Sequence, residues 1–218
     1  MMTKTITLEE YSIDNHIDDH VEKEIQDCFS TEDPKCFFVF AGAGSGKTRS
    51  LINTLTFLDK ERGKSLLMKG KQIAVITYTN AACDEISRRL QYKPIFSVST
   101  IHSFLWDLIK SYQADIKEWV TQFIQKEIEE LQQKQVKGRG GKAGEKRAED
   151  IKKKTERLAK IETVKKFSYN PNGDNVGYDS LSHSEVVKMS TEFIATEPTM
   201  QDILTAKYPI LLIDESQD

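Results

Sequence analysis

The sequence predicts an α/β fold built on a parallel sheet, with a helical hairpin inserted into it. An apolar run, Cys36–Phe40, leads directly into a glycine-rich stretch that ends in Lys47-Thr48. A second apolar run, 209–213, ends at Asp214-Glu215. A third, strongly charged segment, 117–166, repeats its apolar residues at helical spacing. Apolar runs that lead into polar loops are typical of buried parallel strands with ligands at their carboxyl ends.

The glycine-rich stretch predicts a phosphate-binding loop followed by a helix. Residues 41–48 read Ala-Gly-Ala-Gly-Ser-Gly-Lys-Thr. Glycines let successive backbone N–H groups turn toward an anion. Lys47 would neutralise the β- and γ-phosphates, the Thr48 hydroxyl would bind Mg²⁺, and a helix opening at about Thr48 would add its positive end. The alternative is a chance glycine-rich turn, which the preceding strand and the Lys-Thr pair disfavour.

The last residues of the chain place two adjacent carboxylates after a predicted strand. If 209–213 is a buried parallel strand, Asp214 and Glu215 lie at its carboxyl end, where open α/β sheets bind ligands. Asp214 would hold Mg²⁺, directly or through water, and Glu215 would polarise the attacking water. The alternative interpretation is an exposed acidic loop.

Two further segments are each predicted as a strand followed by a helix. Residues 73–78 form an apolar run that small polar residues separate from a helix over 83–90. Residues 95–99 form a second strand, which leads into an aromatic helix over 104–112. Short apolar runs that alternate with helical patterns favour a parallel sheet.

Taken together, these segments resemble the N-terminal part of UvrD/Rep-type superfamily 1 DNA helicases. Residues 41–49 are similar to motif I of that family, 77–86 to motif Ia, 99–104 to motif Ib, and 212–218 to motif II, in the order that the family has them. The resemblance implies a RecA-like P-loop NTPase sheet that uses ATP and Mg²⁺. It also implies single-stranded or duplex-junction DNA as a partner, and 3′→5′ travel.

The resemblance implies a set of site residues as well. Lys47 and Glu215 would be catalytic, and Thr48 and Asp214 would bind the metal. The nucleotide would contact Gln26, Ala43, Gly44, Ser45, Gly46, Lys47, Thr48 and Arg49. The single-strand contact floor would consist of Tyr78, Asn80, Thr100 and His102. Tyr78 stands where the family usually has Phe, and this keeps an aromatic face for stacking on a base.

Gln26 has two interpretations that the sequence leaves open. It lies 21 positions before Lys47, a plausible distance for the glutamine with which the family reads adenine. Its surroundings, Val21–Asp27, lack the Leu-Asn-x-x-Gln setting of that glutamine. Gln26 therefore either reads adenine or is a solvated helix residue.

The middle of the chain predicts a basic helical hairpin. Residues 117–166 carry 15 Lys/Arg and 9 Asp/Glu, a net +6 within a chain of net charge −3. Apolar residues recur at three and four positions in two stretches, Val120, Phe123, Ile124, Ile128 and Leu131, and Ile151, Leu158, Ile161 and Val164. The glycine-rich residues 138–144 between them cannot stay helical. By resemblance this is the 1B insertion. Its basic faces and tip either contact DNA phosphates or are solvated and disordered.

The predicted organisation has three parts. Residues 1–112 are the first part of the ATPase domain, 113–180 the helical insertion, and 181–218 the return to the core. In the resembling family, motif III and a second motor domain with a γ-phosphate arginine would follow Asp218, and the last arginine here is Arg157. The second motor domain is thus expected to be absent, and this chain alone to be weakly active or inactive.

The composition predicts a soluble cytoplasmic protein. No apolar run approaches the length of a membrane span, and the first thirty residues are acidic, unlike a signal peptide. The three cysteines and four histidines lack the spacing of a metal site.

The sequence therefore predicts the ATP-hydrolysing motor domain of a helicase or translocase. Two alternatives stay open. One is a DNA-sensing ATPase in a repair or anti-phage defence complex, with a nuclease or another protein as partner. The other is a nucleotide- or DNA-binding module without turnover.

Overall fold

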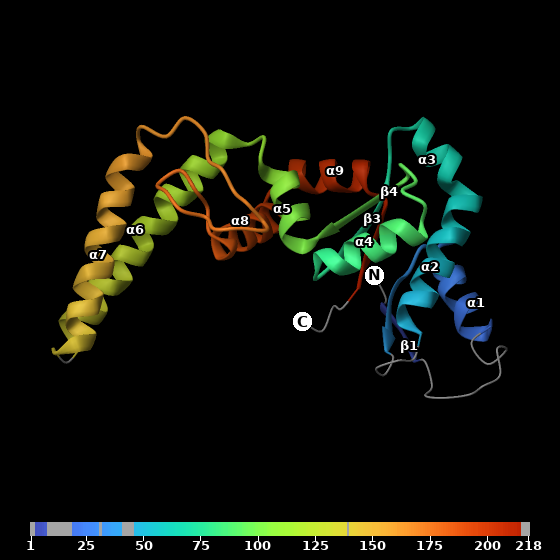
Figure 1. The fold of residues 1–218 in the computed structure, drawn as a ribbon, viewed down its shortest axis with the longest axis horizontal. Coiled ribbons are helices and arrows are strands. Elements are labelled where there is room, and N and C mark those ends of the chain that lie inside the picture. Colours follow the sequence, from blue (N-terminus) through green and yellow to red (C-terminus); the bar gives the residue numbers. More distant parts are fainter. Residues whose placement is uncertain (1–2, 8–18, 31, 41–45, 139, 215–218) are drawn as a thin grey trace. The chain divides into compact units, whose positions relative to one another are not determined.

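A computed structural model of the chain describes residues 3–7, 19–30, 32–40, 46–138 and 140–214 (Figure 1). They form two compact units: unit 1 comprises the described residues within 1–99 and 205–218, and unit 2 those within 100–204. The predicted domain limits stay a prediction.

In chain order the elements are β1 (Thr3–Thr7), α1 (Asp19–Cys28), β2 (Cys36–Phe40), α2 (Lys47–Leu58), the π-helical turn η1 (Asp59–Gly63), α3 (Lys64–Met68), β3 (Ile73–Thr77), α4 (Asn80–Arg89), β4 (Phe96–Thr100), α5 (Ile101–Ile109), α6 (Gln113–Lys137), α7 (Lys142–Ile161), α8 (His183–Thr196), α9 (Pro198–Lys207) and β5 (Ile210–Ile213).

The strands form two small sheets. β1 and β2 pair in parallel, with Thr3 opposite Cys36 and Thr7 opposite Phe40. The other sheet has the order β4-β3-β5, and β3 and β5 run parallel with Ile73 opposite Ile210. All five residues of β3 are buried, so the central strand is covered on both faces, as its continuous apolar run predicts.

The prediction that 209–213 joins one sheet with 36–41 was wrong for the described residues. β5 pairs with β3, whereas β2 pairs with β1, a strand that the sequence reading missed. The physical reason is that an apolar run predicts a strand but not its neighbour. Strand order depends on non-local backbone pairing, and here the N-terminal residues supply the partner of β2.

The helix after the phosphate-loop segment belongs to the same core as the three-stranded sheet. Leu55 and Leu58 of α2 are fully buried in one cluster with β3, with α4 and with Ile210 of β5. Fully burying a leucine contributes roughly 1.5–3 kcal/mol. This packing fixes α2 relative to β3 and β5, although the strand before α2 lies in the other sheet.

Both sheets expose apolar side chains on one face, which leads to a prediction about association. Phe38 and Phe40 of β2 are 52% and 60% exposed, with ring centroids 6.5 Å apart. Leu211 and Ile213 of β5 are 42% and 53% exposed. Because contiguous exposed apolar surface favours association, we expect the 218-residue chain to self-associate.

The test replaces Phe38 and Phe40 with serine and measures mass by sedimentation velocity over a range of concentrations. The double variant should stay monomeric at concentrations where the parent chain associates. Leu67→Ser with Met68→Ser, which removes exposed apolar residues from α3, is the control and should leave association unchanged. A monomeric parent chain, or an equal effect of both pairs, would contradict the expectation.

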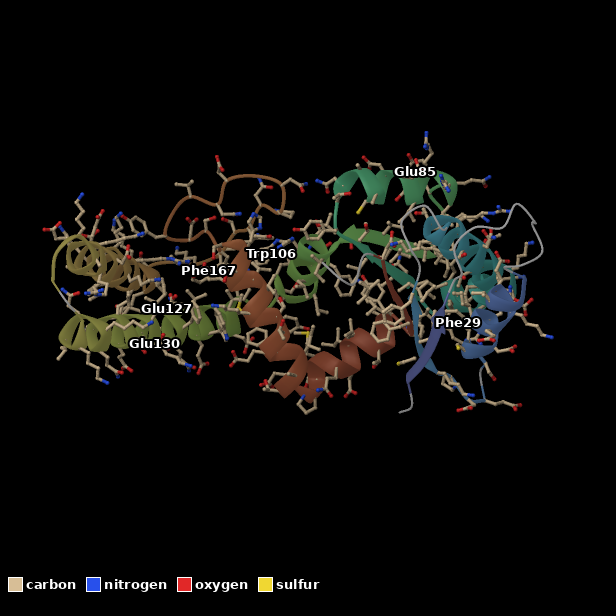
Figure 2. All side chains as sticks on the ribbon, turned by 90° about the horizontal axis from the view of Figure 1, so that it is seen from below. Phe29, Glu85, Trp106, Glu127, Glu130 and Phe167 are labelled. Atoms are coloured by element: carbon tan, nitrogen blue, oxygen red, sulfur yellow. The ribbon has the colours of Figure 1, made fainter. Side chains whose placement is uncertain are left out.

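In unit 2 the helices α6 and α7 run side by side as an antiparallel pair (Figure 1). Ile116, Val120 and Ile124 of α6 are buried, whereas the long outer part of the pair is polar. Glu127, labelled in Figure 2, has an Oε2 atom 2.6 Å from Nζ of Lys154 on α7. α7 begins after Gly141, whose φ of 86° favours glycine at this turn.

A buried ion pair ties α7 to the beginning of α8. Arg157 Nη1 lies 2.6 Å from Oε1 of Glu185, and Arg157 Nη2 donates to the Ser180 carbonyl at 3.1 Å. Glu185 also closes a capping box, since its Oε2 accepts from the Ser182 N–H at 2.8 Å while the Ser182 hydroxyl accepts from the Glu185 N–H. One carboxylate therefore both caps a helix and joins two elements.

Candidate functional site

The beginning of α2 presents the end of the predicted phosphate loop. Gly46 is left-handed, with φ 85° and ψ 16°, and the helix starts at Lys47. The first backbone bond of the helix runs from the Ser50 N–H to the Gly46 carbonyl at 3.0 Å, and no side chain of a described residue caps this end. The N–H groups of the first turn are thus available to an anion. Lys47 and Thr48 are half-buried here, whereas Arg49 is exposed.

Asp214 lies where the sequence placed it, directly after β5. Its backbone N–H donates to the Ile76 carbonyl at 2.8 Å, which continues the ladder between β5 and β3 by one residue. The half-buried Asp214 is therefore held beside the carboxyl end of β3. Because α2 packs on this same sheet, Lys47, Thr48 and Asp214 all belong to unit 1.

Part of the predicted nucleotide site lies outside the described residues. This applies to Ala43, Gly44 and Ser45 of the loop and to the predicted base Glu215. Their roles stay predictions from the sequence.

Two buried hydroxyls that the prediction did not single out lie at the carboxyl ends of β3 and β4. Thr77 Oγ1 and Ser99 Oγ are buried and have no hydrogen-bond partner among the described residues. A buried polar atom without a partner costs about 1–3 kcal/mol. Thr77 begins the stretch similar to motif Ia, and Ser99 begins the stretch similar to motif Ib. These positions within the motifs were the sequence signal that could have identified the two hydroxyls.

Gln26 lies on α1, which packs on the sheet that contains β2. Val21, Ile25 and Cys28 form the buried face of α1, and partly buried Phe37 and Val39 pack against it. Gln26 is half-buried and adjoins this face. Its side chain has no hydrogen bond to another described residue, so both interpretations of Gln26 stay open.

The predicted DNA contacts Tyr78 and Asn80 lie at the end of β3 and the beginning of α4. Tyr78 is 58% exposed, and its large aromatic surface is available for stacking. Thr79 between them caps α4, because its side chain accepts from the Ala82 N–H at 3.2 Å. α4 therefore begins at Asn80, three residues before the predicted start, and Asn80 is exposed on its first turn.

Thr100 is placed by the structure as a helix cap. It is buried, its Oγ1 accepts from the Ser103 N–H at 3.3 Å, and the same hydroxyl lies 3.0 Å from Ser103 Oγ. This cap starts α5 at Ile101, three residues before the predicted helix. The hydroxyl is thus engaged within the chain, and a role in DNA contact stays a prediction.

His102 packs in an aromatic cluster within unit 2. Its ring centroid lies 5.0 Å from that of His183 on α8, in an edge-to-face arrangement. The Tyr169 hydroxyl lies 2.5 Å from His183 Nδ1, and the Tyr169 ring packs against Trp106, which is labelled in Figure 2. Burial, together with the neighbouring His183, holds the pKa of His102 below its usual value. Sequence spacing could not reveal this cluster because His102 and His183 are distant in the chain.

The lowered pKa of His102 predicts a loss of stability in mild acid. The unfolded chain takes up the His102 proton near pH 6.5, whereas the folded chain takes it up only at lower pH. Unfolding is therefore favoured increasingly as the pH falls below about 6.5. His102→Gln should make the decline between pH 7 and 5.5 shallower in urea unfolding. An unchanged pH dependence would contradict this.

The described residues contain no group of three or more metal-ligating His, Cys, Asp or Glu side chains. Nor is any described helix long and apolar enough to cross a membrane.

Residues 22–178 match the family described as UvrD/REP helicase N-terminal domain. The chain belongs to this family. Membership implies a RecA-like fold for the mixed α/β structure. The match begins in α1 and spans the Lys47–Thr48 helix start as well as the α6–α7 pair.

A curated relative is similar over part of the chain. The Gabija protein GajB of Bacillus cereus (strain HuB5-5) is 39% identical over 132 residues, which is 60% of this chain. The matched region is 19% of the length of that relative. This chain therefore corresponds to a small part of GajB.

Proposed function

We propose that the chain is the ATP-binding and ATP-hydrolysing motor domain of a superfamily 1 DNA helicase or translocase. The observation that carries the proposal is the helix start at Lys47 after the left-handed Gly46, on a helix that shares its apolar core with β5, the strand directly before Asp214. A helix N-terminus with a lysine and a threonine, near a sheet that presents a carboxylate, suits a Mg²⁺-nucleotide.

In the proposed reaction, water attacks the γ-phosphate and ADP leaves. Lys47 and the N–H groups of the first α2 turn hold the charge of the phosphates. Thr48 and Asp214 would hold Mg²⁺, which when bound neutralises the β- and γ-oxygens. Glu215 accepts a proton from the attacking water, and Arg49 lies against the nucleotide. Tyr78, Asn80, Thr100 and His102 contact a single DNA strand, with 3′→5′ travel as the expected direction.

Glu215 provides a prediction that separates binding from chemistry. Glu215→Gln keeps the shape of the side chain but removes the base, so ATP binding should persist while hydrolysis slows by about 10²-fold or more. Nucleotide binding and single-turnover hydrolysis are the two measurements. Hydrolysis at the parent rate would show that another group is the base.

The test of the proposed function measures steady-state ATPase activity with and without single-stranded DNA. A helicase assay on a tailed duplex accompanies it. DNA-stimulated hydrolysis supports the motor. Nucleotide and DNA binding without any turnover would instead assign the chain to the class of binding modules.

A second candidate is a DNA-sensing ATPase subunit of a repair or anti-phage defence complex. The similarity to the Gabija protein GajB supports it. The discriminating experiment infects bacteria that carry the gene with phage, and compares the parent with Lys47→Ala. Protection that depends on Lys47 favours the defence complex, whereas equal plaque numbers in both strains and in a strain without the gene oppose it.

A further inference from the structure

A basic hollow lies at the carboxyl end of α7, within unit 2. Its volume is about 500 Å³. The hollow, called here the α7-end pocket, is lined by Lys160, Thr163, Val164, Lys165, Lys166, Tyr178 and Asp179. Ligand sites commonly have volumes of about 300–1,000 Å³, so the hollow is large enough for a nucleotide unit.

The charges of the α7-end pocket are unbalanced. Three lysines face a single carboxylate, that of Asp179. Among the described residues, no carboxylate lies within 4.0 Å of any of these three ammonium groups. Lys160 Nζ instead lies 3.6 Å from the centre of the Tyr178 ring. Lysines gathered around a hollow without counterions attract a polyanion.

The helix end does not account for these lysines. Cations often gather at a helix C-terminus because the last carbonyls need partners. Here two of the carbonyls at this end already have partners: Lys117 Nζ donates to the Glu162 carbonyl at 2.8 Å, and Thr163 donates to the Lys160 carbonyl through its N–H and its hydroxyl. Lys165 and Lys166 are therefore free to serve a ligand.

The walls of the pocket are held in place by the residues next to them. Phe167, labelled in Figure 2, is buried, and its N–H donates to Gln113 Oε1 at 2.7 Å. The Ser168 N–H donates to the Asp179 carbonyl at 2.8 Å, and the parallel bridge between Ser168 and Ser180 joins the two segments that contain Lys166 and Tyr178. A preformed site loses less entropy on binding than a flexible one.

We propose that the α7-end pocket binds the phosphate backbone of a single DNA strand, with Lys165 and Lys166 on phosphates and Tyr178 beside a base or sugar. The proposal extends the DNA-binding part of the proposed function to a second place on the chain. Tyr178 remains 42% exposed despite Lys160 above its ring, so it retains surface for stacking. A free nucleotide offers the same chemistry and is the alternative source.

The test compares two double variants that lose the same charge. Lys165→Gln with Lys166→Gln changes the pocket, and Lys146→Gln with Lys152→Gln changes exposed lysines elsewhere on α7. Binding of a fluorescent oligothymidylate to the 218-residue chain is measured by anisotropy over a series of salt concentrations. The salt slope is the magnitude of the slope of the logarithm of the binding constant against the logarithm of the salt concentration. The pocket variant should lower it by about 1.4, since each single-strand phosphate contact contributes roughly 0.7. The control should lower it clearly less.

Two further arms separate the other outcomes. Tyr178→Leu should weaken binding several-fold with an unchanged salt slope, because it removes stacking but no charge. In a Lys47→Ala background, ATP titration reports nucleotide binding elsewhere than the phosphate loop. Loss of only this nucleotide binding in the pocket variant would overturn the DNA proposal in favour of a free nucleotide. Equal slopes of pocket and control variants overturn it too. A parent chain that binds no DNA refutes the DNA-binding function itself.

Discussion

In a protein that carries this domain together with a second motor domain, replacing Lys47 with alanine is expected to abolish productive ATP binding and hydrolysis. Lys47 is half-buried at the first position of α2, beside the backbone N–H groups of that turn. It is the fixed positive charge of the proposed phosphate site. Removing one preorganised group that stabilises developing charge costs on the order of 10²–10³-fold in rate, and the loss of ground-state binding adds to this.

The measurements are ATP binding by titration and phosphate release under single-turnover conditions. Lys64→Ala is the matched control, since Lys64 is exposed on α3, at the far end of the helical stretch that begins at Lys47. It should bind and hydrolyse ATP as the parent does. Hydrolysis that survives Lys47→Ala, or an equal loss in Lys64→Ala, would refute the assigned nucleotide site.

Four of the strands could be predicted from the sequence because the signals of a strand are local. Apolar runs predicted strands at 36–41, 73–78, 95–99 and 209–213, and the structure has them at Cys36–Phe40, Ile73–Thr77, Phe96–Thr100 and Ile210–Ile213. β1 was missed, although Thr3, Thr5, Ile6 and Thr7 are β-branched and favour a strand. The assignment of β2 and β5 to one sheet was wrong because the apolar residues of a strand do not determine which other strand it pairs with.

Helix starts show the same division between local and distant signals. Thr79 and Thr100 cap α4 and α5, and a threonine at such a position is a readable start signal that would have moved both helices earlier. The packing of His102 on His183 and the ion pair of Arg157 with Glu185 join segments far apart in the chain. No periodicity or spacing encodes such contacts, so only the folded structure reveals them.

The ion pair of Arg157 and Glu185 leads to the largest stability effect that we expect in unit 2. The Glu185 side chain is 7% exposed and that of Arg157 22% exposed, so the pair is largely shielded from water. Arg157→Met leaves the buried carboxylate without its cation. Breaking such a pair costs about 3–5 kcal/mol. We expect about 3 kcal/mol, the lower end, because Ser182 continues to donate to Glu185 through its N–H and its hydroxyl.

Urea unfolding followed by circular dichroism measures the effect, and an exposed ion pair on the same helix supplies the control. Lys153 Nζ lies 2.7 Å from Glu149, but both side chains are more than 60% exposed, so Lys153→Met should have a much smaller effect than Arg157→Met. Glu185→Gln added to Arg157→Met should recover part of the loss, since glutamine removes the stranded charge and still fits the capping box. Two outcomes would show that the buried pair does not stabilise the junction of α7 and α8. One is an equal loss of unfolding free energy in Arg157→Met and Lys153→Met. The other is a further loss, and no recovery, when Glu185→Gln is added to Arg157→Met.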